Sequence, residues 1–461
     1  MTNEESEPTL EVPARDRDIY HRIIVLALPT VAYNIIEMGL GLTDLFMVRS
    51  FGPAATAALG LNRQITFLFE AMILAVSVGV VTLISQSLAQ NDSEKVERTV
   101  AQSLLIVTAL ASILGIAGYL LSPALLRLIQ ASPETAFFAV DYLKIYCISL
   151  LFLGINAVGA AILRAAKNPW LPLKIAIAMA VLNVPLNYAF IHGMFGIVGL
   201  GVKGAAVGTL IVRVLGSLVF LASLFFGHRS TPLVPSRMTR LDSTVIRQIL
   251  AVGLPIAFAG LLRNAARIVF IAIVGFSTLG VSIHAAVGLG LQIRLIGVLP
   301  ALAFQVALAT LVGDAIGRGK LDEAEEIGRR GVYLLGVVMF VLCGCIFLFS
   351  APIADGFIVD PKGAELGARV LRWFAFGQFF STLAIAAQGA LSGAGDTRPV
   401  ARITFLSQWL ILVPLTYILL VPLEMDPNGP LIAWTIAPIL TFTLIFQRFL
   451  SGKWKARLEH S

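Results

Sequence analysis

The chain has 461 residues, of which 57% are hydrophobic and only 13% are charged, and its mean hydropathy is +0.88. Soluble domains use roughly 45–50% apolar residues, so this composition excludes a soluble globular protein. The apolar residues recur in blocks of about 20 along the whole chain, which also excludes a soluble domain with a single membrane anchor. We interpret the formal charge of +7 as loop charge that sets membrane topology, and we expect no nucleic-acid partner.

The chain begins with a polar stretch. Its first 17 residues, MTNEESEPTLEVPARDR, are acidic and polar, and they lack the apolar core of a secretory signal peptide. We therefore predict that residues 1–21 form a disordered N-terminal tail.

Glycine, proline and charge clusters divide the rest of the chain into twelve apolar blocks. Each block is long enough to cross a bilayer as a tilted helix. The blocks cover residues 22–48, 58–87, 99–122, 138–163, 172–193, 204–226, 249–275, 284–313, 331–352, 367–391, 401–422 and 430–450. The predicted fold class is therefore all-α, a polytopic membrane protein with twelve transmembrane helices.

The longest connection lies between the sixth and seventh blocks and is basic and proline-containing. It predicts a linker, residues 228–248, between a first lobe of six spans, residues 22–227, and a second lobe of six spans, residues 249–450. Residues 451–461 form a C-terminal tail. Connections on the side of the termini carry about 22 lysines and arginines against about 8 on the other side, so the positive-inside rule puts both termini in the cytoplasm. We expect a multi-pass protein of the plasma or inner membrane.

The two lobes are related by an internal repeat. A shift of 228 positions aligns AALGLNRQ, residues 57–64, with AAVGLGLQ, residues 285–292, and it also aligns TLISQSLAQ with TLVGDAIGR and LRAAKNP with LSGAGDT. Six spans separate the copies, so both have the same orientation and an axis along the membrane normal should relate them, as in parallel-repeat transporters. We expect substrate to bind between the lobes near mid-depth. Channels also use repeats, but no block has a selectivity-filter-like segment, which favours a transporter.

Polar residues inside the first lobe are candidates for function, because charges within a membrane are costly and usually functional. Glu37 and Asp44 are seven residues apart, which puts them on one face of the first predicted span. The other candidates in this lobe are Asn34, Gln64, Glu70, Asn183 and Asn187. Converging oxygens would suit proton exchange or sodium coordination. Each of these residues also has a structural alternative. Asp44 would cap a kink at the GLG of residues 39–41, and Glu70 would pair with a basic side chain. Asn183 and Asn187 would form hydrogen bonds between helices.

The ionisable residues inside the first two spans of the second lobe are basic rather than acidic. Arg263 and Arg267 lie on one face of its first span and Arg294 lies in its second, and neither span has an acidic residue deep inside. These arginines would hold an anionic or zwitterionic substrate. Alternatively, they would pair with Glu37 or Glu70 as a latch that protonation releases, or their side chains would extend to a membrane interface.

Together these segments resemble the multidrug and toxic compound extrusion (MATE) family over nearly the whole chain, from about residue 23 to residue 448. LALPTVAYNIIEMGLGLTDLFMVRSFG is similar to that family's first span. AALGLNRQ, ISQSLAQND, ILRAAKNPWLP, VLNVPLNYAFIHG and GVKGAAVGT follow in the family's order, and LSGAGDTRP is the second-lobe counterpart of the loop between the fourth and fifth spans.

The resemblance implies a two-lobed antiporter that exports small organic compounds or drugs by alternating access, in exchange for H⁺ or Na⁺. It carries the family's first-lobe cation site onto Asp44, with Asn183 as its fifth-span asparagine and Na⁺ expected at these two residues if sodium is the coupling ion. The next fifth-span position, usually an aspartate, is Asn187, which cannot titrate. Glu37 is our candidate for the missing carboxylate.

The family's second-lobe site uses acids of the seventh and tenth spans, and this chain lacks them. It has Arg263 in the seventh, and only Gln378 and Gln388 in the tenth. We therefore expect ion coupling in the first lobe, and the charge of the exported compound stays open. The chain also differs from the family's pattern at Arg49, after the first span, where the family commonly has glycine. The expected substrate-facing residues are Gln64, Glu70, Arg263, Arg267, Arg294 and Gln378.

Two rival functions follow from the same residues. The first is a flippase or exporter of an anionic or lipid-linked compound that uses the second-lobe arginines. The second is an enzyme acting on a lipid, which we do not favour because the sequence has no zinc motif, nucleophile elbow or phosphate loop. We expect no cofactor beyond the coupling ion, small organic substrates and membrane lipids as partners, and a monomer.

Overall fold

The structure is a computed structural model, which describes residues 14–128, 130, 132–194, 198–227 and 241–458. Its helices in the first lobe are α1 (Ala14–Val48), α2 (Pro53–Ala89), α3 (Ser93–Leu128), α4 (Pro133–Ala165), α5 (Trp170–His192) and α6 (Val202–Ala222). Those in the second lobe are α7 (Ser243–Val274), α8 (Val281–Gly317), α9 (Leu321–Leu348), α10 (Ser350–Phe357), α11 (Pro361–Gly393), α12 (Arg398–Ser407), α13 (Val413–Leu420) and α14 (Asn428–Leu450). A short helix, α15 (Lys453–Leu458), follows.

The prediction of twelve membrane spans is confirmed. Within the described residues, 12 helical segments are long and apolar enough to cross a membrane. The eleventh span consists of α12, a π-helical turn at Gln408–Leu412, and α13. Several helices extend beyond the predicted apolar blocks, because their polar ends continue the backbone hydrogen bonds outside the apolar region.

The internal repeat is also confirmed, and its offset is the one read from the sequence. α2 and α8 both have 37 residues, and α4 and α11 both have 33, with equivalent bounds 228 positions apart. The turns after α4 and α11 have the same hydrogen bond: Asn168 N donates to Leu163 O and Asp396 N donates to Leu391 O, both at 2.9 Å. The two lobes are therefore copies of one six-span unit.

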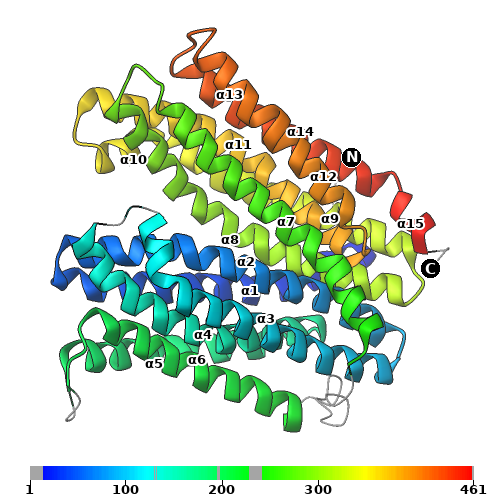
Figure 1. The fold of residues 1–461 in the computed structure, drawn as a ribbon. Coiled ribbons are helices and arrows are strands. Elements are labelled where there is room, and N and C mark those ends of the chain that lie inside the picture. Colours follow the sequence, from blue (N-terminus) through cyan, green and yellow to red (C-terminus); the bar gives the residue numbers. More distant parts are fainter. Residues whose placement is uncertain (1–13, 129, 131, 195–197, 228–240, 459–461) are drawn as a thin grey trace, which may run out of the picture.

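The lobes meet at one end of the molecule. Figure 1 shows the ribbons of the two lobes converging at the end that carries both chain termini and separating towards the other end. α2 packs against α7 and α8 of the second lobe. Within the described chain, a side chain added at Gly60 of α2 or at Gly288 of α8 would meet nothing within 4 Å. These matched positions lie near the start of each helix, whereas the hydrogen bonds from α2 to the second lobe lie near its end, at Thr82 and Gln86.

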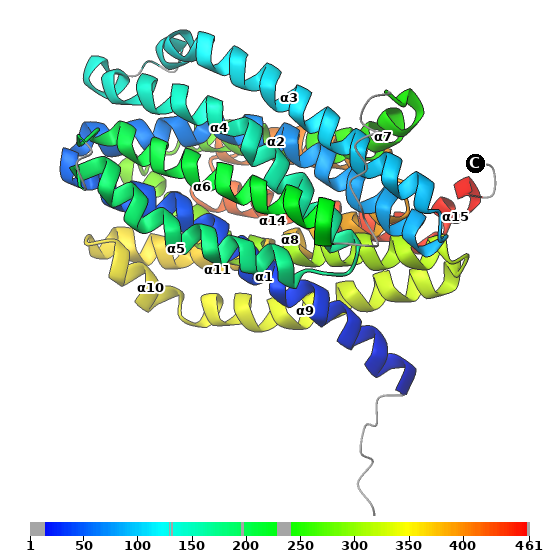
Figure 2. The same cartoon turned by 90° about the horizontal axis from the view of Figure 1, so that it is seen from below.

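Helix α1 belongs to both lobes. In its first half Ile19 and Ile23 are buried in the hydrophobic core of the second lobe, whereas Val48 at its other end is in the core of the first. Figure 2 shows this helix passing from beside α9 to beside α5. The predicted boundary of the first lobe at residue 22 therefore divides a helix that the tertiary structure shares between the lobes.

The predicted tails are partly helical. α1 begins at Ala14, so residues 14–21 of the predicted N-terminal tail are helical, and α15 lies within the predicted C-terminal tail. Asp242 caps α7, its Oδ1 accepting from Thr244 N at 3.0 Å and Val245 N at 3.2 Å. Residues 1–13, and residues 228–240 of the predicted linker, lie outside the described residues.

Candidate functional site

Asp44 is the centre of a buried polar cluster in the first lobe. Its side chain is 4% exposed, although it lies within a membrane-spanning helix. Asn187 Nδ2 donates to Oδ1 at 2.6 Å, Tyr142 OH donates to Oδ2 at 3.2 Å, and Thr209 Oγ1 donates to Oδ2 at 3.1 Å. The carboxylate thus has three neutral donors, one each from α5, α4 and α6.

Both fifth-span asparagines join this cluster. Asn187 Nδ2 also donates to Asn183 Oδ1 at 3.1 Å, and Asn183 Nδ2 donates to Thr209 Oγ1 at 3.2 Å. The structure therefore brings Asp44, Asn183 and Asn187 together. It adds Tyr142 and Thr209, which carried no sequence signal because uncharged tyrosine and threonine are common in membrane helices.

The cluster provides oxygen atoms of the kind that bind Na⁺. The carboxylate of Asp44, the amide oxygens of the two asparagines and the hydroxyl of Thr209 are hard oxygen ligands. The donors around Asp44 satisfy an ionised carboxylate, and a proton or Na⁺ at the same oxygens would neutralise its charge. No group of three or more His, Cys, Asp or Glu residues gathers as a metal site in the part of the chain that the structure describes.

Glu70 belongs to a second, neighbouring network. Tyr146 OH donates to Glu70 Oε1 at 2.5 Å, and Arg63 Nη1 lies 3.5 Å from the same oxygen. Arg213 of α6 donates to Tyr146 OH at 3.3 Å and to Ser149 Oγ at 2.6 Å. The expected basic partner of Glu70 is therefore present, and it comes from the first lobe itself.

Arg213 is the functional candidate that our reading of the sequence missed. It lies within electrostatic reach of Asp44, Glu37 and Glu70. It is also an ionisable residue inside the predicted span 204–226, so the criterion that selected Glu37 would have selected it. The positive charge of Arg213 offsets the concentration of acidic groups in this lobe.

Glu37 has partners of its own. It interacts with Tyr33, one helical turn away, and electrostatically with Arg164 and Arg213. Asp44 is not among its hydrogen-bond partners, because seven residues of helix separate the two by about 10 Å along the axis. The structure therefore does not bring Glu37 into the Asp44 cluster as the missing carboxylate. The latch hypothesis stays a prediction: in the described conformation Glu37 and Glu70 interact with basic side chains of their own lobe.

The remaining first-lobe candidates lie apart from Asp44. Asn34 Nδ2 donates to the carbonyl oxygen of Leu299 in α8 at 3.4 Å, so its side chain faces the second lobe. Gln64 of α2 is exposed. Neither contributes to the buried cluster.

The second-lobe arginines lie between α7, α8 and α11. Arg263 Nη1 donates to Gln388 Oε1 at 3.3 Å, and Arg267 contacts the amide oxygen of Asn264. Arg294 lies within electrostatic range of both Arg263 and Arg267. All three are partly exposed.

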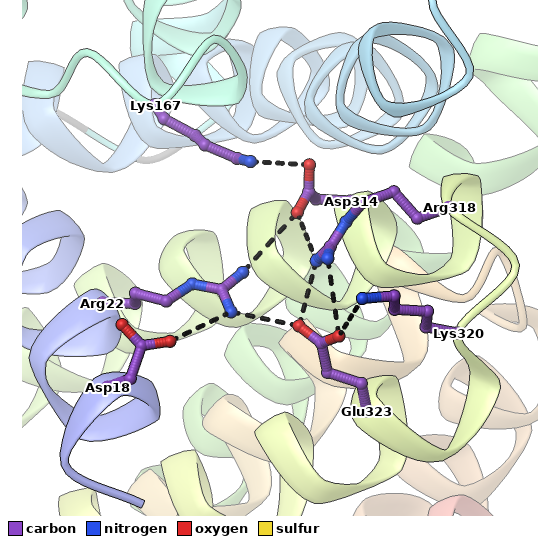
Figure 3. Close-up of polar contacts among 7 residues, drawn as sticks. All are labelled: Asp18, Arg22, Lys167, Asp314, Arg318, Lys320 and Glu323. Carbon is purple, nitrogen blue, oxygen red and sulfur yellow. Dashed lines mark hydrogen bonds and ion pairs between the residues drawn. The ribbon is translucent and has the colours of Figure 1, made fainter. Parts of the chain in front are cut away.

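An ion-pair cluster joins the lobes at the end that carries the termini. Asp314 of α8 is central: Lys167 Nζ lies 2.6 Å from Oδ1, while Arg318 Nη2 and Arg22 Nη2 lie 2.8 Å and 3.6 Å from Oδ2. Arg22 Nη1 also reaches Glu323 Oε1 at 3.0 Å. Figure 3 shows Lys167 and Arg22 approaching this acidic pair from the first lobe. The cluster ties the start of α1 and the turn after α4 to the second lobe.

Comparisons with known proteins agree with this architecture. The MatE family model matches residues 29–189 and again residues 255–418, once in each lobe. The chain is 28% identical over 456 residues to a probable multidrug resistance protein NorM of Thermotoga maritima, covering 98% of this chain and 95% of the relative. It is 26% identical to multidrug resistance protein MdtK of Pectobacterium atrosepticum, covering 95% and 97%. A crystal structure of MATE in the bent conformation superimposes with a TM-score of 0.86 at 21% identity, covering 95% of this chain and 97% of that one.

Proposed function

Because the chain belongs to the MatE family, we propose that it is a cation-coupled antiporter that exports small organic compounds by alternating access. The curated relatives described above are named multidrug resistance proteins, which supports efflux of organic compounds. We place the coupling site at Asp44, with H⁺ or Na⁺ as the coupling ion.

The observation that carries this proposal is the burial of Asp44 among neutral donors. An ionised carboxylate in a membrane helix is costly unless it is compensated, and the direct partners of Asp44 carry no formal charge. Binding of H⁺ or Na⁺ therefore changes the energy of the cluster strongly. A ligand shifts a conformational equilibrium only by its difference in affinity between the two states, and such a buried site supplies that difference.

Helix α1 connects this site to the contact between the lobes. Asp44 lies near one end of the helix, and Arg22, near the other end, pairs with Glu323 and Asp314 of the second lobe. Pro29 and the glycines at positions 39 and 41 lie between them, and both residue types permit bending of a helix. Neutralising Asp44 would thus move a helix whose other end holds the lobes together.

The described conformation is closed where the termini lie. Besides the ion pairs, Gln86 Nε2 donates to Gly393 O at 2.8 Å and Thr82 Oγ1 donates to Ser392 O at 2.9 Å, both across the lobe interface. With the predicted orientation, these contacts close the cytoplasmic side. Export requires a second conformation in which they break.

The test is efflux from liposomes containing the purified protein. Ethidium and carboxyfluorescein serve as cationic and anionic probes, and a proton gradient and a sodium gradient are imposed separately. We expect one gradient to drive efflux of at least one probe, and the Asp44→Asn variant to lose this gradient dependence while remaining folded. Asp355→Asn is the matched control, because Asp355 is exposed on α10 of the second lobe. Gradient-driven efflux at the wild-type rate by Asp44→Asn would refute the assignment.

A further inference from the structure

We propose that Arg263, Arg267 and Arg294 form a binding site for the oxyanion group of the exported substrate. Such a group is a carboxylate, sulfonate or phosphate. This inference rests on the proposed export function and adds to it the chemical class of the substrate.

Both α7 arginines lie within electrostatic range of Arg294 on α8. Arg263 and Arg267 lie one turn apart on α7, and Arg294 on α8 is close enough to be repelled by both. The charges of Arg263 and Arg267 destabilise the charge of Arg294 unless an anion compensates them. The site therefore favours binding of negative charge.

No acidic side chain in the described ranges forms an ion pair with any of these arginines. Arg263 and Arg267 instead donate to the neutral amides of Gln388 and Asn264. Arg294 Nε is buried and has no hydrogen-bond partner among the residues that the structure describes. The contrast with the first lobe is direct, because Arg213 there interacts with acidic groups from two helices.

A second, independent observation lies on the neighbouring helix. Gln378 of α11 is 4% exposed, and neither its amide nitrogen nor its amide oxygen has a hydrogen-bond partner in the described chain. Its Nε2 would lie 3.0 Å from a Cβ at Gly297, one helical turn beyond Arg294 on α8. Buried amides are normally satisfied, so an unpartnered amide lies at the α8–α11 contact, one turn along α8 from Arg294.

The chemistry of the side chains specifies an oxyanion. Guanidinium is planar and always charged, and its paired N–H groups match the oxygen atoms of carboxylate, sulfonate or phosphate. The amides of Gln388 and Asn264 position the arginines without neutralising them. A cationic compound would meet repulsion from three charges at this position.

Binding can be tested without transport. The probes are carboxyfluorescein and the trisulfonated dye pyranine, and fluorescence anisotropy is measured with the full chain in a neutral detergent. We expect Arg263→Gln and Arg294→Gln to weaken binding by about tenfold or more, because each removes a charge-assisted hydrogen bond. Arg263→Lys should fall between these variants and the wild type, since lysine keeps the charge but loses the planar fork.

The matched control is Arg369→Gln, which removes an exposed arginine of α11. It should change binding by no more than about twofold, as for other surface substitutions. Thermal unfolding without dye shows whether each variant is folded. We expect the glutamine variants of the site to be as stable as the wild type or more stable, because their substitution relieves repulsion. Added anion should raise the Tm of the wild type more than that of these variants.

A third probe distinguishes a soluble oxyanion from a lipid headgroup. Vesicles containing fluorescent phosphatidylglycerol report movement of the lipid between leaflets through its accessibility to dithionite. Arginine-dependent lipid movement identifies an anionic lipid as the substrate, and arginine-dependent binding of the dyes identifies a soluble anion. Either result supports the oxyanion site. The inference is overturned if none of the three probes depends on these arginines. Arginine-dependent binding without gradient-driven efflux would instead refute the proposed function alone.

Discussion

Lys167 Nζ lies 2.6 Å from Asp314 Oδ1, and this ion pair joins the two lobes. Lys167 has a left-handed backbone conformation, with φ of 60°, and its repeat counterpart Gly395 has φ of 73°. Glycine adopts this conformation without the steric cost that lysine has. The same turn thus occurs in both lobes. In the first lobe its left-handed position is Lys167 rather than glycine, and the lysine side chain reaches the opposite lobe.

Replacing Lys167 with glycine should favour opening between the lobes without disturbing the turn. Lys167 is 47% exposed and Asp314 keeps Arg318 and Arg22, so losing this ion pair should raise the population of the open state by about 1.5–5-fold, if the pair exists only in the closed state. The measurement is the rate at which a maleimide labels Ser85→Cys, because Ser85 is 1% exposed and packs against Gly313 of the other lobe. The exposed Cys345 is replaced by serine in all variants.

Lys203→Ala is the control for this experiment, since Lys203 pairs with Asp141 inside the first lobe. Its labelling rate should equal that of the unaltered background. An unchanged rate in Lys167→Gly would show that the ion pair does not hold the lobes together.

Gly253→Leu should separate the lobes by steric overlap. A Cβ at Gly253 would overlap the carbonyl oxygen of Ala75 in α2, and a backbone atom cannot move aside as a side chain can. We expect a loss of about 1–3 kcal/mol in the free energy of unfolding, together with faster labelling at position 85. Gly60→Leu is the control. It gains the same helix propensity, but the new side chain meets no atom within 4 Å at its Cβ, so the free energy of unfolding of this variant should not fall. Equal effects of the two substitutions would contradict close packing at this crossing.

Asn187→Asp should change the ion dependence of transport. Its nitrogen lies 2.6 Å from Asp44 Oδ1, so an aspartate would put two carboxyl groups in contact. Like charges so close do not both ionise, and the pair must share a proton or a cation. We expect stronger retention of one H⁺ or Na⁺, measured as a shift in the ion concentration that gives half-maximal efflux. Asn156→Asp on α4 is the comparison, because Asn156 donates to Arg213 O rather than to Asp44. An identical ion dependence in Asn187→Asp and the wild type would count against the site.

Arg213→Gln should destabilise the first lobe. The substitution removes the charge of Arg213 near Glu37 and Glu70, although Arg63 stays 3.5 Å from Glu70, and losing the charged donor's hydrogen bonds to Ser149 and Tyr146 costs about 1.5–3 kcal/mol. Thermal unfolding in detergent measures this loss. Adding Glu70→Gln to the same chain should recover part of the stability, because it removes one of the acids that Arg213 helps to compensate. No recovery in the double variant would mean that Arg213 acts through packing alone.

Much of the architecture was predictable because a bilayer restricts the chain to apolar helices. The twelve spans and the repeat offset could be read from the sequence, since apolar length and repeated segments are local properties. Asp44, Asn183 and Asn187 could be selected as well, because polar residues are rare in such helices. Tyr142 and Thr209 could not, since their role comes only from their position beside Asp44.

The sequence by itself determined how many times the chain crosses the membrane, how its halves correspond and which residues are too polar to face lipid. The tertiary structure alone decided how those charges are compensated. Glu37 and Glu70 are compensated within the first lobe, while Arg263 and Arg294 have no acidic partner among the described residues. The physical reason is that electrostatic energy depends on distances between helices that are far apart in the chain. The same applies to α1, whose division between the lobes follows from packing at both of its ends.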